Sequence, residues 1–508
     1  MSYKIPEVMD TTNRDGEQMD GVSFSPEEKL LIARNLLNIG VSRVEVASAH
    51  AVGEDRRALE EICKMADVLG KPRSVEVLGF VNTKSVDWIY DAGGRVINLL
   101  TKGSREHREV QLKKTLVQHL GDVSKVIDYA KSKGMDINVY LEDSTTGMME
   151  DLDDVLRMIG ALEKMQVKRI MLPDTRGRLP FWSTEEYLRK IIKEFSNTHI
   201  DYHAHNDYEM AVANTLAAIR AGVSGVHLTL NGLGERTGNA NLYSVVAGAK
   251  DHLGIDLGID EESFMELSRL VELASRVRVG PNAPIVGRNA HYQSAGIHAD
   301  GDKKGELYKA KLRSKRFGAE TTQYTLGKVS GNASIEMNLR NLGITAEPEV
   351  VKRLTERVRE LGGQKTTVTP DDLFLLFLDE TGASKEKPFE IIECSADVGL
   401  QGTRKGYVKM KVNGTLYEET GIGDGGYDAI ANAIRKITDS AKFLLPKLVD
   451  YDVRIPPGGG TGALVETVIT WENGEGKTFR TTGVDTDQTI AAVKATERML
   501  NLVGLGYK

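Results

Sequence analysis

The chain has 508 residues, enough for about two to four domains, and its composition of 40% hydrophobic and 27% charged residues is typical of globular proteins. A net charge of −7, from 66 basic and 73 acidic residues, argues against a partner that is nucleic acid or a membrane surface. With only two cysteines, the chain cannot form a disulfide framework. It also contains no run of 18 apolar residues, the length needed to span a membrane, so we expect a cytoplasmic protein.

The first half of the chain alternates short β-rich runs with amphipathic helical patterns. Eight strands are predicted, at 7–9, 43–48, 75–80, 96–101, 136–142, 169–173, 199–205 and 225–231. Helices are predicted between them, at 26–38, 58–69, 116–133, 152–165, 184–195 and 210–220. This alternation predicts a (β/α)₈ TIM barrel. A doubly wound open sheet is the alternative, but no Gly-x-Gly-x-x-Gly follows the first strand.

The rest of the chain divides into a mainly helical connector and a C-terminal α+β domain. Residues 331–382 contain helical patterns, and the charged segment 383–388 indicates a hinge. In the last part, a set of strand-like runs followed by a helix occurs twice, about 60 residues apart, which indicates an internal duplication. The predicted domains are 1–275, 276–388 and 389–508. We expect the last to bind a small-molecule effector, with a simple dimerisation module as the alternative.

Two histidines at one strand end are the first candidates for metal ligands. His203 and His205 lie two residues apart in a predicted strand, so their side chains should project from the same face. A pair of imidazoles can bind a divalent metal, although a His-x-His spacing alone is a weak signal. Their position at the seventh strand strengthens the interpretation, because active sites of such barrels lie at the C-terminal strand ends.

Other strand ends carry further candidates. Asp15 could be a third ligand and Asn239 a weaker fourth, a mixed nitrogen and oxygen set that suits Zn²⁺, Mn²⁺ or Co²⁺. Arg14 could stabilise charge on a substrate oxygen, or form only a structural salt bridge. Glu142 could be a general base or a loop anchor, and Thr175 could hold a carboxylate. Three more strand-end residues would by default be barrel core: Leu78, Leu100 and Tyr140.

Three motifs in order closely resemble the signatures of the DRE-TIM metallolyases. They are Asp-Thr-Thr-Asn-Arg-Asp-Gly-Glu-Gln at 10–18, His-x-His-Asn-Asp at 203–207, and Asn-Gly-x-Gly-Glu-Arg-x-Gly-Asn at 231–239. The last two are similar to the acetyl-CoA-dependent branch, which contains the 2-isopropylmalate, homocitrate and citramalate synthases. The resemblance continues through 296–301 into a C-terminal domain like the regulatory domain of these synthases. One departure is Asn13, where the family usually has Leu; we expect its side chain to point away from the metal.

The resemblance implies a Claisen-type condensation that needs a divalent metal (Zn²⁺, Mn²⁺, Mg²⁺ or Co²⁺) and acetyl-CoA as cosubstrate. A 2-oxo acid would chelate the metal, with Arg14 on its keto oxygen and Thr175 near its carboxylate. Glu142, with His298, would promote enolisation of acetyl-CoA. Further residues match connector positions that, in the family, reach the active site of the partner subunit: His298, Asp300 and Tyr308. This implies a homodimer.

Substrate and effector follow from two further sets of matched residues. Leu78, Leu100 and Tyr140 match the apolar set around the pyruvate methyl in citramalate synthases, whereas isopropylmalate synthases need a roomier pocket. The expected products are therefore (R)-citramalate and CoA, with isoleucine as feedback inhibitor; 2-oxoisovalerate with leucine is the alternative. The residues matching the effector pocket are Tyr427, Asp428, Tyr451, Ile455, Thr461, Val465 and Gln488.

Two other functions remain possible on the same motifs. The barrel could run cleavage, as in the lyase branch, but the duplicated C-terminal domain argues against that. The chain could also be a catalytically inactive amino-acid-binding module, which the intact candidate ligands and Arg14 make less favourable. The glycine-rich stretch 456–462 is interpreted as a turn and not as a phosphate loop, since no Lys-Ser or Lys-Thr follows it.

Overall fold

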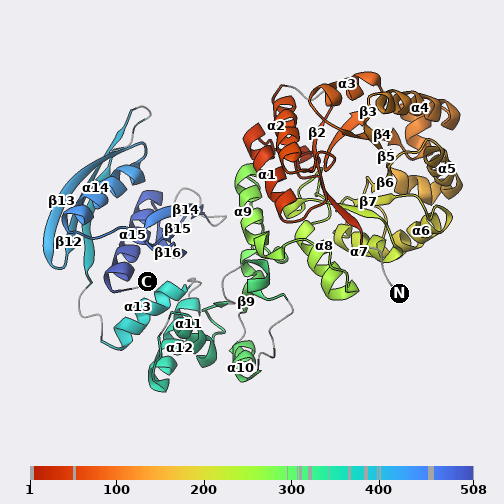
Figure 1. Ribbon diagram of the computed structural model, residues 1–508. Helices are drawn as coiled ribbons and strands as arrows, with labels where there is room; N and C mark the ends of the chain where they lie inside the picture. The colour runs from red at the N-terminus through yellow and green to blue at the C-terminus, as the bar shows by residue number, and fades with distance from the viewer. Residues whose placement is uncertain are drawn as a thin grey trace. The chain divides into compact units, whose positions relative to one another are not determined.

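A computed structural model describes most of the chain in two compact units (Figure 1). The described residues are 5–49, 53–293, 296–305, 307, 312–318, 323–342, 344–363, 368–382, 387–397, 399, 402–455, 463–476 and 478–506. The first unit comprises 1–291 and 310–322, and the second comprises 292–309 and 323–508.

The first unit is a closed barrel of eight parallel strands, which confirms the TIM-barrel prediction. Each strand pairs with its neighbours in the chain, and β1 pairs with β8 to close the barrel. The alternative prediction of a doubly wound open sheet is therefore wrong. The strands are β1 (Glu7–Asp10), β2 (Arg43–Ser48), β3 (Val75–Phe80), β4 (Val96–Lys102), β5 (Asp136–Glu142), β6 (Arg169–Asp174), β7 (Ile200–Ala204) and β8 (Gly225–Leu228).

Helices surround these strands (Figure 1). They are α1 (Pro26–Asn38), α2 (Glu54–Val68), α3 (Thr83–Asp91), α4 (Leu116–Ser132), α5 (Ser144–Lys164), α6 (Phe181–Glu194), α7 (Ala211–Ala221), α8 (Leu242–Gly248) and α9 (Phe264–Ser275). Short helical turns are η1 (Gly16–Gln18), η2 (His107–Gln111), η3 (Leu230–Gly232), η4 (Ala249–Leu253), η5 (Glu261–Ser263), η6 (Arg288–His291) and η7 (Ser314–Phe317).

Local sequence signals explain where several of these helices begin. Ser25 and Glu28 form a reciprocal capping box at the start of α1. Asn82 accepts a hydrogen bond from the Ser85 amide and starts α3, a helix that the periodicity did not predict. The helix predicted from 152 already begins at Ser144, with a kink at Asp151, so α5 runs directly from the end of β5.

The second unit begins with short elements and a group of helices. They are β9 (Tyr292–Gln293), α10 (Gly296–Gly305), β10 (Gln323–Tyr324), α11 (Asn332–Asn341), α12 (Pro348–Gly363) and α13 (Pro370–Glu380). Buried residues of α11, α12 and α13, including Leu339, Leu354 and Leu373, share one apolar core. The mainly helical connector is thereby confirmed in character, while the boundaries 275/276 and 388/389 stay predictions.

The C-terminal part contains two three-stranded antiparallel sheets, each followed by a helix, as the internal repeat predicts. The first set is β11 (Phe389–Ala396), β12 (Arg404–Val412), β13 (Thr415–Gly423) and α14 (Gly426–Ser440). The second is β14 (Lys447–Arg454), β15 (Val465–Glu472), β16 (Thr478–Asp485) and α15 (Gln488–Gly504). Residues from both sets contribute to a single apolar core.

The two sets repeat even their tightest contacts. A β-carbon at Gly421 in β13 would collide with the backbone of Ala429 and Ala433 in α14. A β-carbon at Gly483 in β16 would meet the backbone of Ala491 and Ala495 in α15 in the same way. Glycine is needed at both positions because helix backbone lies directly against strand backbone. The matching contacts confirm the duplication. Within the described residues, no helix is long and apolar enough to cross a membrane.

Candidate active site

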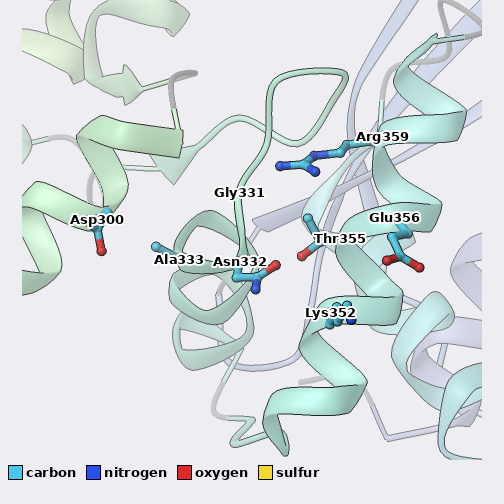
Figure 2. A pocket seen from close by; sticks show the side chains of 8 residues that line it. All are labelled: Asp300, Gly331, Asn332, Ala333, Lys352, Thr355, Glu356 and Arg359. Carbon is cyan, nitrogen blue, oxygen red and sulfur yellow. The ribbon is translucent and has the colours of Figure 1, made fainter.

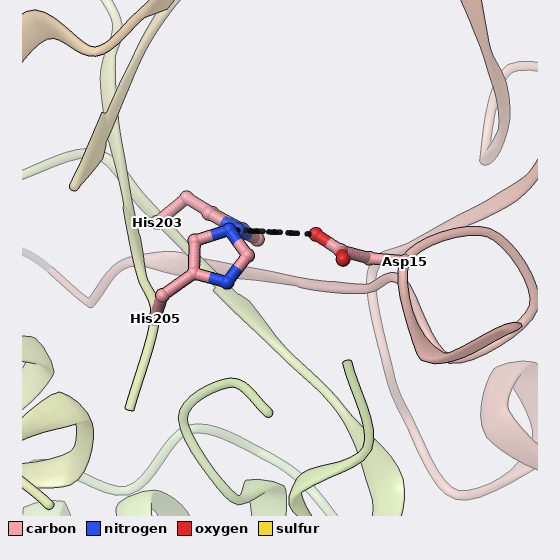
Figure 3. A group of neighbouring side chains, drawn as sticks. All are labelled: Asp15, His203 and His205. Atoms are coloured by element: carbon pink, nitrogen blue, oxygen red, sulfur yellow. Dashed lines mark hydrogen bonds and ion pairs between the residues drawn. The ribbon is translucent and has the colours of Figure 1, made fainter. Parts of the chain in front are cut away.

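Asp15, His203 and His205 meet at the C-terminal end of the barrel (Figure 3). The Nε2 atoms of His203 and His205 lie 3.3 Å apart, and Asp15 Oδ2 lies 3.2 Å from His203 Nε2 and 4.0 Å from His205 Nε2. Ligand atoms of one ion with bonds of about 2.1 Å lie roughly 3–3.4 Å apart; two of the three separations fall in that range and the Asp15–His205 separation is wider, so the group is a candidate site for a divalent metal. The paired projection predicted for the two histidines is confirmed.

Several polar atoms beside this group are buried without a hydrogen-bond partner among the described residues. They include Asp15 Oδ1 and both side-chain atoms of Asn239, whose backbone forms a bridge to His205. Gly234 brings the loop so close that a β-carbon there would strike the Asn239 amide. A buried amide without a partner is costly, and a cation nearby would satisfy its oxygen. Asn239 as a fourth ligand stays a prediction.

The charge state of the three side chains suits metal binding. Burial alone would raise the pKa of Asp15, but Arg14 and the two histidines hold that pKa well below its usual value. Burial lowers the pKa of His203, and it lowers the pKa of His205 to about 4. At neutral pH the site therefore presents one carboxylate and two neutral imidazoles, the forms that coordinate a metal.

The Arg14 guanidinium is held by three neighbours. Its Nη1 pairs with Asp15 Oδ2 at 3.1 Å, its Nε with Glu45 Oε2 at 2.6 Å, and its Nη2 lies 3.4 Å from the Tyr140 hydroxyl. Glu45 is fully buried on β2 and also accepts hydrogen bonds from Thr11 and Asn98. The orientation of Arg14 is thus fixed before any substrate binds, which is the requirement for electrostatic stabilisation.

Leu78, Leu100 and Tyr140 come together with Met9 and Met171 in an apolar cluster inside the barrel. The shared position expected for the first three is therefore found. Tyr140 is more than an apolar wall, however, because its hydroxyl lies 3.1 Å from His227 Nδ1 in addition to its contact with Arg14. An aromatic ring buried with its hydroxyl bonded cannot shift freely.

Glu142 and Thr175 lie at the ends of β5 and β6. Glu142 is partly exposed and forms an ion pair with Lys102, its direct neighbour in the β4–β5 pairing. The Thr175 hydroxyl accepts a hydrogen bond from the Asp143 amide at 2.9 Å, which leaves its own proton available to a substrate. Their roles as base and carboxylate ligand stay predictions.

The remaining catalytic candidates belong to the second unit or lie outside the described residues. His298 and Asp300 are on α10, and Asp300 pairs with Lys304 at 2.6 Å. Asp300 also lines a cavity of about 500 Å³ together with residues of α11 and α12 (Figure 2). Tyr308 lies outside the described residues.

Four of the predicted effector residues line one cavity of about 970 Å³ in the C-terminal domain: Tyr427, Asp428, Tyr451 and Gln488. They come from the start of α14, from β14 and from the start of α15. Among the other predicted members, Val465 is buried at the start of β15, Ile455 is exposed, and Thr461 lies outside the described residues. Trp471 and Met499 also line the cavity, which provides apolar surface.

Sequence reasoning assigned no role to three residues that hold the site together: Glu45, Lys102 and His227. Each is a charged or polar residue on a barrel strand that also carries buried apolar residues. A signal for Glu45 was present, because Arg43 and Glu45 alternate with valines at a spacing of two, which places both on one face of the strand. Charges on the inner face of a barrel must be paired, so they point to a buried network.

Comparisons with known proteins agree with this geometry. Residues 5–271 match the HMGL-like family, 285–366 match a homocitrate synthase post-HMGL domain-like family, and 367–503 match the LeuA allosteric (dimerisation) domain. The chain is 34% identical over 475 residues to an (R)-citramalate synthase of Methanocaldococcus jannaschii, covering 92% of this chain and 93% of that protein.

Two further relatives carry different names. A putative (R)-citramalate synthase of Archaeoglobus fulgidus is 33% identical over 499 residues, covering 98% of this chain and 99% of that protein. A 2-isopropylmalate synthase of Methanocaldococcus jannaschii is 32% identical over 498 residues, covering 96% of this chain and 92% of that protein. The chain therefore belongs to the HMGL-like family, as an acyl-transferring enzyme of the branch that holds the citramalate and 2-isopropylmalate synthases.

Proposed function

We propose that the protein condenses acetyl-CoA with pyruvate and releases (R)-citramalate and CoA. The observation that carries the proposal is the closed apolar cluster of Leu78, Leu100 and Tyr140 with two methionines beside Arg14. Large side chains at these positions favour a small substrate side chain such as a methyl group over a branched one. The first relatives in sequence similarity, named as citramalate synthases, support the same substrate.

Each step of the reaction has a candidate residue. Glu142 takes a proton from the acetyl methyl group, and the carbon so activated attacks the keto carbon of pyruvate, forming the new carbon–carbon bond. The keto oxygen gains negative charge, which the fixed Arg14 guanidinium stabilises, and then a proton. Water then cleaves the thioester, releasing the CoA thiol and leaving a second carboxylate on the product.

Asp15, His203 and His205, with Asn239, would hold a divalent metal. When bound, such an ion supplies positive charge that polarises the keto group of the oxo acid. Thr175 can donate its hydroxyl proton to the oxo-acid carboxylate, and Lys102 pairs with Glu142 and holds its carboxylate at the end of β5. The metal could be Zn²⁺, Mn²⁺, Mg²⁺ or Co²⁺.

A second candidate reaction uses 2-oxoisovalerate and gives 2-isopropylmalate. The similarity to 2-isopropylmalate synthases is nearly as high as that to citramalate synthases, which favours keeping this alternative. One extra methylene changes discrimination by only about 1–3 kcal/mol in an apolar pocket, so weak activity on longer oxo acids is expected in either case.

The C-terminal domain completes the proposal. We propose that its cavity binds isoleucine, or leucine if the alternative reaction holds, and that this inhibits the barrel. A homodimer, supported by the match to a dimerisation domain, would bring His298, Asp300 and Tyr308 to the active site of the partner subunit. The cytoplasmic location expected from the sequence belongs to the same proposal.

The test follows CoA release from acetyl-CoA with pyruvate, 2-oxoisovalerate or 2-oxoglutarate supplied in turn. The proposal predicts the highest kcat/KM with pyruvate and a product whose mass is that of citramalate. A much higher kcat/KM with 2-oxoisovalerate would replace the proposal by its alternative, and no CoA release with any oxo acid would refute both.

The same assay tests regulation. Isoleucine should inhibit more strongly than leucine if pyruvate is the substrate. Inhibition should disappear in Tyr427→Ala while activity without effector stays near that of the unchanged protein, because Tyr427 lines the C-terminal cavity. Insensitivity of the unchanged protein to both amino acids would contradict the regulatory part.

A further inference from the structure

We infer that His227 is a positioning residue for substrate selection: it anchors the Tyr140 hydroxyl and thereby fixes both the pocket wall and the Arg14 guanidinium. The inference rests on the proposed function in one respect, that Tyr140 contacts the oxo acid. His227 lies on β8 and belongs to none of the candidate catalytic, metal or substrate residues.

His227 is fully buried between two partners. Its Nδ1 lies 3.1 Å from the Tyr140 hydroxyl oxygen, and its Nε2 lies 3.0 Å from Asp201 Oδ2. The ring also packs edge-on against Tyr140, with 5.5 Å between ring centroids. Both ring nitrogens are therefore engaged, and the side chain connects β7 to β5 across the barrel interior.

Asp201 determines which nitrogen of His227 carries the proton. The Asp201 carboxylate pairs with Arg43 Nη2 at 2.7 Å and can only accept a hydrogen bond, so His227 Nε2 must donate to it. With Nε2 donating to Asp201, the opposite ring nitrogen, Nδ1, is left to accept a hydrogen bond. The Tyr140 hydroxyl consequently donates its proton to His227 Nδ1.

A second acceptor for the Tyr140 hydroxyl is less favourable. Glu45 Oε2 lies 3.4 Å away, farther than His227, and it already accepts from Thr11 at 2.7 Å and from Arg14 at 2.6 Å. Because the Tyr140 hydroxyl donates its hydrogen bond to His227, its oxygen can accept one from Arg14 Nη2, 3.4 Å away. One continuous chain of contacts thus runs from Asp201 through His227 and Tyr140 to Arg14.

This series of contacts from Asp201 to Arg14 affects the choice of oxo acid. The Tyr140 ring packs with Leu78 and Leu100, and its position sets how much space remains for the substrate side chain. A ring held at its hydroxyl cannot swing away to admit a branched substrate. Loss of the anchor should therefore weaken discrimination against larger oxo acids more than it weakens binding of acetyl-CoA.

The test is a double-mutant cycle of Tyr140→Phe and His227→Gln, read as the ratio of kcat/KM for pyruvate to that for 2-oxoisovalerate. The Gln amide can still reach Asp201 in place of Nε2 but offers nothing to Tyr140. We expect His227→Gln to lower the ratio about fivefold or more, the worth of one buried hydrogen bond, with KM for acetyl-CoA within about twofold. In the Tyr140→Phe background the same change should alter the ratio less than about twofold. Equal effects in both backgrounds would overturn the inference.

His227→Asn separates positioning from general structural damage. Its side-chain oxygen takes the place of Nδ1 and can accept from Tyr140, whereas the contact with Asp201 is lost. The inference predicts a ratio close to that of the unchanged protein for His227→Asn. A loss as large as that of His227→Gln, which keeps the Asp201 contact, would mean that an acceptor for the Tyr140 hydroxyl does not preserve the ratio, and would overturn the inference even if His227→Gln folds poorly.

The exposed His252, changed to Gln, is the matched control and should leave the ratio unchanged. Failure of the proposed function is distinguishable, because it would show in the unchanged protein as a preference for 2-oxoisovalerate. In that case the coupling between His227 and Tyr140 can still be read from the same cycle.

Discussion

The barrel and the C-terminal domain have interiors of opposite character. In the barrel, Arg43 pairs with Glu76 and Asp201 and Arg14 pairs with Glu45, all in the buried centre. The C-terminal core is made of aliphatic and aromatic side chains, with helices pressed against glycines of the strands. The barrel therefore buries paired charges, whereas the C-terminal domain buries mainly apolar side chains.

The largest loss of activity should follow from removing one of the candidate metal ligands at the C-terminal end of the barrel. Asp15→Ala or His203→Ala should lower kcat by about a thousandfold or more and reduce the bound metal, since the metal supplies several kcal/mol of stabilisation. Turnover assays and metal analysis of the purified proteins provide the measurement. Exposed His252→Ala is the control, and retained turnover in His203→Ala would refute the ligand assignment.

Removing one buried partner of Arg14 should have the next largest effect. Glu45→Gln leaves the guanidinium with a neutral neighbour inside the barrel, and breaking a buried pair costs about 3–5 kcal/mol. Denaturant unfolding measures the loss, and kcat should also fall. Glu60→Gln breaks the exposed pair with Arg56 and should change stability by less than about 0.5 kcal/mol. Similar losses for both variants would contradict the comparison.

Acid should weaken the barrel more than the C-terminal domain. Burial raises the pKa of Asp201 and Glu45, but Arg43 and Arg14 outweigh it and hold both pKa values below their usual range. Such groups contribute stability that is present above the unfolded pKa of about 4 and lost as the pH falls toward the folded pKa.

Thermal unfolding between pH 7 and pH 3, with probes in each unit, measures the effect. Asp10 acts in the opposite sense: burial raises its pKa to about 7, so its contribution is present at low pH and lost as the pH rises through 7. An acid transition that begins in the C-terminal domain would contradict the expected order.

Substitution of a tightly packed glycine tests the packing inside the C-terminal domain. Gly483→Ala should destabilise the C-terminal domain by about 1–3 kcal/mol or more, because the new methyl meets the α15 backbone. Effector inhibition should be lost while activity without effector remains. Gly474→Ala adds the same methyl group where nothing lies within 4 Å, and should be neutral. Calorimetry and the inhibition assay decide between these outcomes.

The smallest effect should come from one hydroxyl in the C-terminal cavity. The Tyr427 hydroxyl lies 2.7 Å from Thr496 Oγ1, which holds the ring against the cavity. Tyr427→Phe should raise the effector concentration for half inhibition about fivefold, the worth of one hydrogen bond near 1 kcal/mol. The exposed Tyr208→Phe in the barrel should change nothing. An unchanged inhibition curve for Tyr427→Phe would separate the ring from effector binding.

The sequence was sufficient to predict the arrangement of helices and strands and the residues at the ends of the barrel strands. Alternation of strand and helix patterns predicts the closed barrel, and the i, i+2 spacing of His203 and His205 predicts their common direction. These signals are local, so a single chain reveals them.

The contacts that fix the site could not be predicted in the same way. Tyr140, His227 and Asp201 are 26 to 87 residues apart in pairs, and the residue types do not say which nitrogen meets which oxygen. Tyr140 was therefore interpreted as an apolar wall until the barrel showed its hydroxyl in a polar network. Short helices such as α3 were missed because their caps, and not their periodicity, define them.

The most direct test of the central claim is a competition experiment with the unchanged protein. Equal concentrations of pyruvate and 2-oxoisovalerate share one limiting supply of acetyl-CoA, and mass spectrometry measures the ratio of the two products, which equals the ratio of kcat/KM values. The apolar cluster of Leu78, Leu100 and Tyr140 leads us to expect that citramalate predominates by about tenfold or more, the effect of roughly 1.4 kcal/mol. A mixture dominated by 2-isopropylmalate would contradict the account.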